Sequence, residues 1–580
     1  MPNRSRPFEL GRIAIVAAII TVATACVTER GKRKLDLGVD PMASPLADSA
    51  AYRDTIGAYT YYEGLRPMRV RGYGLVVGLG HNGSSDCRRD VYDQLVQTLY
   101  KRYSFNRPTV GVQSVTPEEM IGDLDTAVVV VEGDIPPGAV KGSRFDVAVR
   151  VMPGTQTKSL HGGRLFGMDL EMFREVTETE SIPGQRLAWA AGPLFQNPFS
   201  GDGAATPTSL LDGVVIGGGV VLEDRRVRLV LLEPSYSRSR AIQDRINAYF
   251  PGPQKTADAM SPSYVRILVP DEYRGDVGHF LTLVRALYLR NDSTFQAHTA
   301  KALAGELVRP GTQAALISLA FEGLGRAALP ELDPLYTHPK DVVSFHAAAA
   351  GLRGDDHLAA DAMSAHAQDP ECEFRFQAIR ALGVARGIAS TAMTLRGLLH
   401  DEDPRVQSAA YEALLARGDA SIKSVPVGTE NFLLDLVPTE RTNFIYVKRS
   451  DSRRIALFGR DMRCVPPVLY RAPDGVVTMT ALPDDTVLTL IRVVVGSGTA
   501  SPPISAPFDV PALIRLLGGE AGVDADGTAT GLGLDYAAVA RALYHLCEDG
   551  SINAKFILEQ PNAAELFGPA RDDERPESEL

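Results

Sequence analysis

The spacing of apolar residues changes at about residue 291, and this change constrains the fold more than any other feature of the chain. In residues 61–290, segments with a period of two alternate with segments of helical spacing. Residues 145–151, for example, place Phe or Val at every second position. In residues 291–424, alanine and leucine dominate and the period-two pattern stops. The pattern predicts a multidomain chain, with an α+β body followed by an all-α region.

The first region contains several further elements with clear periodicity. Val227–Leu231 and Tyr264–Val269 have strand patterns, and Val91, Leu95 and Leu99 share one helical face. Two more helices are predicted behind capping side chains: one over 240–250 after Ser237 or Ser239, and one over 277–287 after Asp276.

The second region contains a weak repeat of a little over thirty residues. Asp369-Pro370 and Asp403-Pro404 are each predicted to open a helix, because aspartate caps a helix and proline fits its first turn. Pro339 with residues 347–352 gives an earlier copy. Residues 291–424 therefore resemble HEAT repeats, in which each helix pair buries its apolar face against its neighbours and the stack offers a binding surface.

Strand patterns return near the C-terminus, in a part of the chain that resembles no family known to us. Residues 425–506 are predicted to form a β-rich domain, and residues 507–556 a helical segment. The strands are expected at Phe432–Leu436, Asn443–Val447, Arg454–Phe458 and Thr486–Val495. Residues 557–580 are predicted to be an acidic, disordered tail.

The N-terminus has the pattern of an export signal. Arg4, Arg6 and Arg12 precede thirteen mostly apolar residues, Ile13–Ala25. Such a run is too short to span a bilayer, which takes ~20 residues, so residues 1–25 are predicted to be a cleaved signal peptide.

Cys26 follows small residues in a pattern that resembles the lipobox of bacterial lipoproteins. Lipidation at Cys26 would make residues 26–60 a tether, and the absence of aspartate at Val27 and Thr28 favours the outer membrane. The usual leucine three positions before the cysteine is Ala23. An ordinary cleaved signal with a chance cysteine remains the alternative.

Charge and cysteine usage exclude other classes of protein. The formal net charge is −11, which leaves no electrostatic footprint for nucleic acid. Cys87, Cys372, Cys464 and Cys547 lack the spacing of a zinc site, and the sequence alone does not pair them in disulfides.

Residues 72–79 read Gly-Tyr-Gly-Leu-Val-Val-Gly-Leu and are followed by Asn82-Gly83. A phosphate-binding loop is a poor interpretation, because the spacing is not G-x-G-x-x-G and no P-loop lysine follows. A strand whose glycines permit close backbone approach fits better, and Asn82-Gly83 then predicts a tight turn.

Further segments at 133–147, 158–163 and 191–194 follow in a fixed order. Together with 72–79 they resemble the flagellar P-ring protein family over residues 61–290. The positions that carry this resemblance are Gly72, Tyr73, Gly74, Gly78, Asp134, Pro136, Pro137, Gly142, Ser143, Asp146, Ser159, Leu160, Gly162, Gly163, Gly192 and Pro193.

The resemblance implies a periplasmic structural protein without catalytic site or cofactor. Members of the family assemble as a closed ring around the rod of the flagellar basal body, at the peptidoglycan layer and beside the L-ring. A ring requires a heterologous interface between identical subunits, repeated until the rotation closes.

Three features depart from the family pattern. The turn after Leu79 is one residue longer and contains His81, the family's further β-rich segment is missing after Leu289, and family members normally carry no lipid. Three hypotheses follow: a basal-body subunit, an envelope lipoprotein adaptor that binds proteins outside the flagellum, or an envelope hydrolase within residues 425–580.

Catalytic and metal-binding motifs are missing from the sequence. It contains no H-E-x-x-H, G-x-S-x-G, S-x-x-K or Walker A pattern. His357 and His366 are expected to be solvated, and the carboxylate pairs 355–356 and 484–485 to lie in turns. Residues 524–527 resemble a calcium loop only weakly, because glycine stands at the fourth position instead of the sixth. We therefore expect neither an enzyme nor a metal site.

Overall fold

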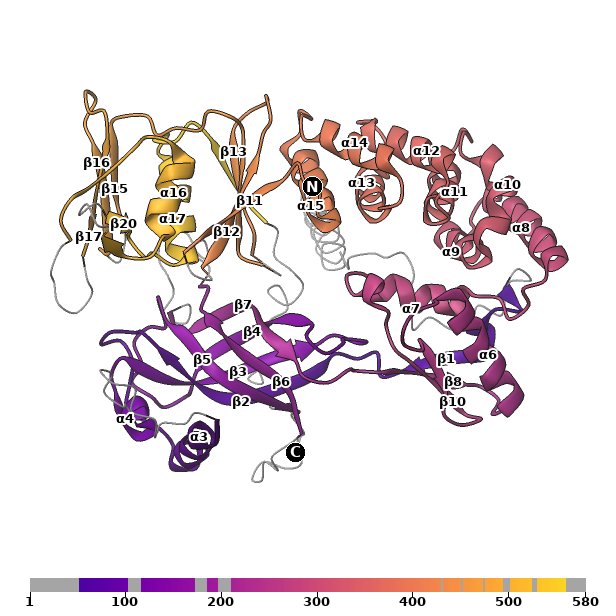
Figure 1. Cartoon of the computed structure of the whole chain (residues 1–580), viewed down its shortest axis with the longest axis horizontal. Helices are drawn as coiled ribbons and strands as arrows, with labels where there is room; N and C mark the ends of the chain where they lie inside the picture. Colours follow the sequence, from indigo (N-terminus) through magenta and orange to yellow (C-terminus); the bar gives the residue numbers. More distant parts are fainter. Residues whose placement is uncertain are drawn as a thin grey trace, which may run out of the picture.

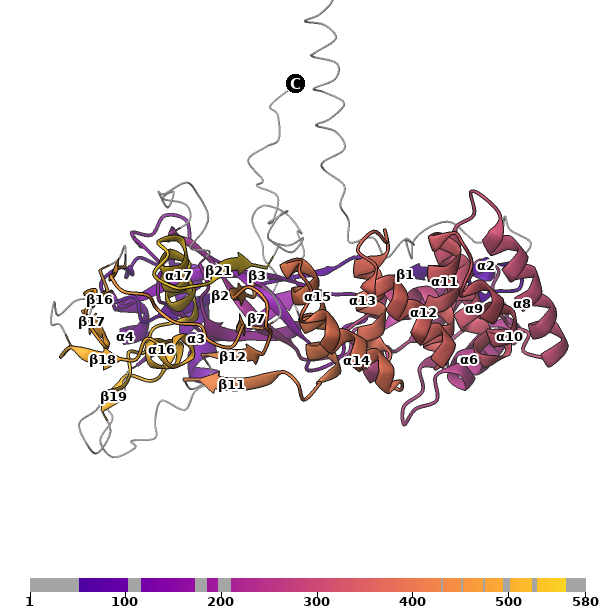
Figure 2. The ribbon, with the colours of Figure 1, turned by 90° about the horizontal axis from the view of Figure 1, so that it is seen from above.

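The computed structural model describes residues 52–102, 116–172, 185–196, 210–428, 431–449, 452–472, 475–493, 501–523 and 529–559. The predicted multidomain class is confirmed: a strand-rich N-terminal body leads to a helical stack and then to a second strand-rich body. The chain returns on itself, so that the C-terminal body lies beside the N-terminal barrel (Figures 1 and 2). Among the described residues, no helix is both long and apolar enough to span a bilayer.

A closed antiparallel barrel with strand order β2-β3-β4-β7-β6-β5 forms the first body. The period-two prediction for residues 145–151 is confirmed, because their Phe and Val side chains fill the barrel interior. A barrel this small has room only for its own side chains. The strands are β2 (Met68–Val77), β3 (Thr126–Ile135), β4 (Arg144–Val151), β5 (Arg164–Met172), β6 (Arg186–Pro193) and β7 (Asp212–Val221).

Two helices cover part of the barrel's outer wall: α3 (Arg89–Arg102) and α4 (Pro117–Gly122). The predicted face of α3, formed by Val91, Leu95 and Leu99, packs against Leu75 of β2. Leu75 is buried on the outside of the barrel because these helices cover it.

A small antiparallel sheet, ordered β1-β8-β10-β9, follows beside the barrel. Its strands are β1 (Thr60–Glu63), β8 (Val227–Leu231), β9 (Ala257–Ala259) and β10 (Tyr264–Ile267). One of its faces is covered by helices, and the helical elements here are α2 (Ile56–Tyr59), α6 (Tyr236–Tyr249), η3 (Asp271–Tyr273) and α7 (Val277–Ala286). The region 61–290 is therefore two bodies, a barrel and a small α/β unit.

Three local predictions in this region can be compared with the structure. Asp276 caps α7 as predicted, accepting a hydrogen bond from the backbone N–H of His279. The cap of α6 is Ser235, not Ser237 or Ser239, because Ser235 is the residue with extended backbone whose Oγ reaches the N–H of Arg238. The tether prediction is wrong for residues 52–60, since Ile56 is fully buried and pairs with Leu287 through its backbone.

The helical stack shares one continuous hydrophobic core with the small sheet. Its helices are α8 (Ser293–Val308), α9 (Ala314–Leu324), η4 (Gly325–Ala328), α10 (Leu329–Leu332), η5 (Asp333–Leu335), α11 (Asp341–Arg353), α12 (His357–Gln368), α13 (Arg375–Val384), α14 (Ala389–Leu398) and α15 (Pro404–Arg417). Asp403 caps α15 as predicted. Asp369 does not open a helix: it ends α12, and α13 begins six residues later at Arg375.

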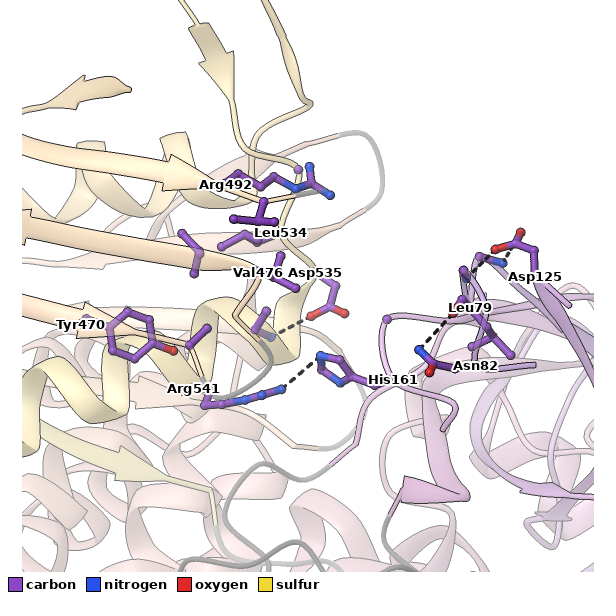
Figure 3. Close-up of a pocket in the computed structure, with 18 residues that line it drawn as sticks. Leu79, Asn82, Asp125, His161, Tyr470, Val476, Arg492, Leu534, Asp535 and Arg541 are labelled. Carbon is purple, nitrogen blue, oxygen red and sulfur yellow. Dashed lines mark hydrogen bonds between the residues drawn. The ribbon is translucent and has the colours of Figure 1, made fainter. Parts of the chain in front are cut away.

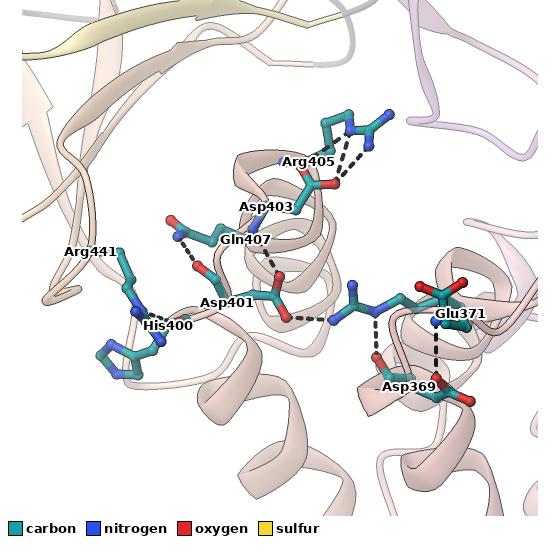
Figure 4. Close-up of polar contacts among 10 residues, drawn as sticks. Asp369, Glu371, His400, Asp401, Asp403, Arg405, Gln407 and Arg441 are labelled. Atoms are coloured by element: carbon teal, nitrogen blue, oxygen red, sulfur yellow. Dashed lines mark hydrogen bonds and ion pairs between the residues drawn. The ribbon is translucent and has the colours of Figure 1, made fainter.

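Polar contacts lock the loops between these repeats (Figure 4). The Arg375 side chain, nearly buried, donates to the Ala367 carbonyl at 3.1 Å and pairs with the Asp401 carboxylate at 2.5 Å. Gln407 donates to the Asp401 carbonyl from the next helix. Arg441, from the C-terminal body, donates to the His400 carbonyl at 2.8 Å. The repeats therefore hold one another, and the last of them holds the domain that follows.

The C-terminal body is a β-α-β sandwich with two helices between two sheets (Figure 1). The first sheet, ordered β11-β12-β14-β13-β21, contains β11 (Lys423–Val427), β12 (Phe432–Val437), β13 (Phe444–Val447), β14 (Arg454–Phe458) and β21 (Lys555–Leu558). The second contains β15 (Val468–Arg471), β16 (Val477–Ala481), β17 (Leu488–Arg492) and β18 (Ile504–Ala506). The other elements are α16 (Val510–Gly518), α17 (Tyr536–Glu548) and the pair β19 (Gly522–Val523) and β20 (Ala529–Gly531).

Two predicted boundaries in this region are wrong. The β-rich part 425–506 and the helical part 507–556 share one core, so they form a single domain. Residues 557 and 558, assigned to the tail, belong to β21, which pairs with β13 in parallel. The pattern missed this strand because its partner lies about 110 residues earlier in the chain.

A buried charged network joins the stack to the C-terminal body. The carboxylate of Asp435, fully buried on β12, accepts hydrogen bonds from Tyr411 of α15 and from Ser424. Arg454 of β14 pairs with the same carboxylate at 2.8 Å. A buried charge of this kind is stable only while all its partners are present.

The Asp435 network gives a direct prediction for stability. Asp435→Ala leaves the Arg454 guanidinium and the Tyr411 hydroxyl buried without their acceptor, which should cost about 3–5 kcal/mol at this junction. Hydrogen exchange at α15, β12 and β14 measures the loss. The matched control is Glu440→Ala, which removes an exposed pair with Arg460 and should cost less than about 1 kcal/mol. Equal effects of the two substitutions would contradict the proposed junction.

Candidate functional site at the end of the barrel

The glycines of the 72–79 segment let β2 and β5 approach closely and close the barrel. A Cβ atom at Gly72 would lie 2.6 Å from the Asp169 carbonyl oxygen, and one at Gly74 would lie 2.3 Å from the Met168 sulfur. The β2–β5 register also shifts between Arg71 and Val76. The interpretation of this segment as a strand with close backbone approach is confirmed.

Other motif positions shape the backbone of the barrel, within strands β4 and β6 and in the turn before β4. Asp146 accepts a hydrogen bond from the Gly217 N–H at 2.6 Å, and the Ser143 hydroxyl accepts one from the Val140 N–H at 3.2 Å. Gly142 and Gly192 have positive φ, at 85° and 141°, where a side chain would be strained. These residues therefore specify backbone geometry.

The remaining motif positions divide between core and surface. Leu160 is fully buried, and Tyr73 packs beneath α3. Asp134 forms an exposed ion pair with Arg69 across β2 and β3, at 3.5 Å. The structure places the others as follows: Pro136 and Pro137 lie in the turn after β3, Ser159 and Gly163 flank Leu160 before β5, and Pro193 ends β6.

Three loops, at residues 78–83, 123–126 and 158–163, meet at one end of the barrel through backbone hydrogen bonds, and we call them the motif loops. Both oxygens of the Asp125 carboxylate accept backbone N–H groups, from Gly78 at 3.2 Å and from Gly80 at 2.6 Å. The tight turn runs from Leu79 to Asn82, closed by the Asn82 N–H on the Leu79 carbonyl. It therefore lies just before the Asn82-Gly83 position expected from the sequence.

A pocket of about 470 Å³ separates these loops from the C-terminal body (Figure 3). The barrel side contributes residues 78–80, Asn82, Asp125, His161 and Gly162, and the other side contributes residues from β15 to β17 and from α17. At its edge, Arg541 of α17 reaches His161 at 3.4 Å. Phe195 of the barrel packs on Tyr536, with ring centroids 5.8 Å apart. The two bodies thus share a real interface around the pocket.

Several polar side chains of this pocket hold turns and a helix cap of the fold. Asp535 caps α17 by accepting the Ala538 N–H at 2.7 Å, and Arg492 donates to the Leu532 carbonyl. Asp125 holds the barrel loops, as described above. Within the described residues, no group of three or more His, Cys, Asp or Glu side chains could hold a metal ion. The arrangement suits docking of one body on another.

Sequence reasoning missed the C-terminal half of this pocket. Arg492 and Arg541 belong to no motif, and they line this pocket only because the chain folds back over the barrel. Asp535 could have been predicted from the sequence as a helix cap, because it immediately precedes an amphipathic helix.

One cysteine–histidine contact lies elsewhere, inside the stack. His366 is half-buried and not solvated as expected, because its ring bridges Ser344 at 2.9 Å and the Cys372 sulfur at 3.3 Å. Burial lowers the pKa of His366 and raises the pKa of the Cys372 thiol. Both shifts favour the neutral forms, so this pair does not form the thiolate–imidazolium of a catalytic cysteine. His357 is exposed, as predicted.

Comparison with known families agrees with this geometry. The family described as "Flagellar P-ring protein" matches residues 56–298, and HEAT repeats match residues 359–427. A flagellar P-ring protein of Geobacter metallireducens is 30% identical over 272 residues, which cover 44% of this chain and 67% of that protein. The chain belongs to the flagellar P-ring protein family.

Further relatives show the extent of the likeness. The P-ring protein of Nitrobacter hamburgensis is 30% identical over 265 residues, covering 43% of this chain and 64% of its own length. That of Caulobacter vibrioides is 28% identical over 264 residues, covering 43% and 63%. This chain therefore spans a little under two thirds of these two relatives. The P-ring match contains the whole barrel and small sheet, and it ends within α8.

The loop end of the P-ring barrel can be tested at Gly83. A Cβ atom there would lie 2.0 Å from the Thr126 carbonyl oxygen and 2.5 Å from that of Leu124, so Gly83→Ala forces the backbone to move. We expect a loss of about 1–3 kcal/mol in barrel stability, as for overpacked cores. Trp189 on β6 is the single tryptophan of the chain, so its emission during urea unfolding reports on the barrel.

The matched control is Gly122→Ala at the end of α4. No atom outside its own turn of helix lies within 4 Å of a Cβ built there, so the stability should change by less than about 0.5 kcal/mol. A Gly83→Ala variant as stable as this control would show that the loops are not packed as described.

Proposed function

We propose that this chain is an exported structural subunit of the flagellar basal body, which assembles as a P-ring-like ring around the rod in the periplasm. The observation that carries the proposal is the family match over 56–298, which spans the complete barrel and small sheet. The P-ring family is a family of structural flagellar proteins and not of enzymes. The pocket between the barrel loops and the C-terminal body, whose polar groups hold turns and a helix cap, is consistent with a structural role.

The proposed partners follow from a ring. Copies of this chain would contact one another through a heterologous interface, and the inner surface would contact the rod. The L-ring and peptidoglycan would be neighbours. A lipid on Cys26 would anchor the N-terminus in the outer membrane, with residues 1–25 removed as a signal peptide. Cys26 lies outside the described residues.

Imaging of basal bodies in a deletion strain tests the ring role. The proposal expects the density at the P-ring position to be lost or reduced and swimming to be impaired, and expects both to return when the gene is restored. An unchanged ring together with normal swimming would overturn it.

The anchor is tested separately by Cys26→Ser. If Cys26 carries the lipid, the variant should leave the membrane fraction and appear in the soluble periplasmic fraction, because the lipid that anchors the protein is no longer attached. Cys87→Ser is the matched control and should leave fractionation unchanged. Membrane retention of the Cys26→Ser protein equal to wild type would rule out lipid anchoring at this residue.

A second candidate function is an envelope adaptor that uses the same P-ring-like body outside the flagellum. It is favoured by one observation: the stack and the C-terminal body lie outside the P-ring match, and the latter covers the motif loops. Affinity purification from solubilised membranes separates the two functions. Recovery of flagellar proteins alone would count against the adaptor, whereas recovery of none would favour it.

A further inference from the structure

Two of the four described cysteines lie at the core of the C-terminal body, and both carry free thiols in the structure. Cys464, in the segment before β15, is a buried member of this core. Cys547, in the last turn of α17, is partly buried and packs against the same core. On α17 it follows Ala540 and Leu543 at helical spacing, so its side chain continues the buried stripe of the helix.

Backbone pairing brings the segment of Cys464 beside the chain that leaves α17. Cys464 lies opposite Ile552 in an antiparallel bridge. Hydrogen bonds of 2.8 Å and 3.3 Å on either side of this pair join residues 463–465 to residues 551–553. Residues opposed in this way have Cα atoms about 4.5 Å apart.

The turn after α17 then returns Ile552 to the end of the helix. The Ile552 N–H donates to the Leu546 carbonyl at 2.9 Å, and the Gly550 N–H donates to the Cys547 carbonyl at 3.1 Å. Gly550 has a φ of 71°, the left-handed conformation that commonly ends a helix and reverses the chain. The residue opposite Cys464 is therefore bonded to the immediate neighbour of Cys547.

Electrostatic interaction agrees with this arrangement. Burial is the main cause that raises the pKa of Cys547 to about 12, and a negative charge on Cys464 is the next. Burial also raises the pKa of Cys464 to about 12. At Cys87 and Cys372, by contrast, the charges that act on the thiol belong to neighbouring carboxylates and, at Cys87, to an arginine. Among the described cysteines, the fold thus brings Cys464 and Cys547 together.

We propose that Cys464 and Cys547 form a disulfide, which fixes the end of α17 to the segment before β15. The disulfide rests on the export included in the proposed function, because disulfides form and persist outside the cytoplasm.

The oxidant for this bond is a second disulfide, either of a small thiol or of a thiol oxidase. The thiolate of one cysteine attacks a sulfur of the oxidant, forms a mixed disulfide and releases one oxidant thiol. The thiolate of the other cysteine then attacks the first cysteine's sulfur and releases the second oxidant thiol. Two protein thiols are oxidised, one oxidant disulfide is reduced, and the two protons of the protein thiols end on the released thiols.

The bond forms during folding, before the core closes. The attacking species is the thiolate, and burial in the finished core favours the neutral thiol at both positions. Once formed, the bond closes a loop of about 80 residues. The opposite end of α17 meets the barrel, through Tyr536 on Phe195 and Arg541 on His161. The disulfide therefore holds the far end of the helix that docks on the barrel.

The test follows the four described cysteines during refolding. The chain from residue 26 onward with Cys26→Ser is reduced, unfolded in urea and refolded in a mixture of reduced and oxidised glutathione. Remaining thiols are alkylated and the peptides are identified by mass. We expect the peptides of Cys464 and Cys547 to be joined in most molecules, with Cys87 and Cys372 alkylated. Alkylation of both Cys464 and Cys547, or equally frequent bonds to the other two cysteines, would overturn the proposal.

Thermal unfolding shows whether the bond fits the fold. The oxidised protein should unfold at a midpoint roughly 5–15 °C above that of the same protein in reductant, because the bond constrains the unfolded chain. Cys547→Ser should abolish this difference. Cys87→Ser is the matched control, a partly buried cysteine beside the barrel, and should keep the full difference. An oxidised parent no more stable than the reduced one would overturn the proposal.

These outcomes are separate from those of the anchor and the ring. Refolding takes place without cells, so the pairing is decided whether or not the chain is exported. Protein alkylated at the moment of cell lysis tests the compartment, and the bond should be present there too. Free thiols in that sample, together with the bond after refolding, would support the pairing and count against export.

Discussion

The close contact between β2 and β5 is the constraint on which the rest of the molecule depends. Gly72 and Gly74 leave room there for Asp169 and Met168, and a side chain at either position would push the strands apart. Closure of the barrel aligns the ends of β2, β3 and β5. That alignment brings Gly78, Gly80 and Asp125 into the hydrogen-bonded loop cluster. The residues of the family motif thus allow the barrel to close and determine the shape of the loops at one end of it.

The domains that follow the barrel lead the chain back to that end, where the C-terminal body packs. The small sheet and the helical stack share a core, and the Asp435 network fixes the last repeat to the C-terminal body. The chain then returns, so that α17 meets the motif loops through His161 and Arg541. A P-ring-like body therefore presents its loops to its own C-terminal domain (Figure 1).

Sequence reasoning succeeded where a signal is local. The alternation at 145–151, the caps Asp276 and Asp403 and the glycine strand are each read from neighbours within a few residues. It failed where two local solutions compete, as at Asp369, where the same Asp-Pro pair ends one helix instead of opening the next. It could not place Arg541 at the barrel, because its contact with His161 across about 380 residues depends on the path of the whole chain.

The central claim is that this protein is a built-in part of the basal body. Quantitative mass spectrometry of purified basal bodies, washed free of membrane, tests it most directly. The account predicts that the protein remains with them in an amount comparable to the ring and rod proteins, with peptides from both the barrel and the C-terminal body. Its absence from basal bodies, with full recovery in the washed membranes, would contradict the account.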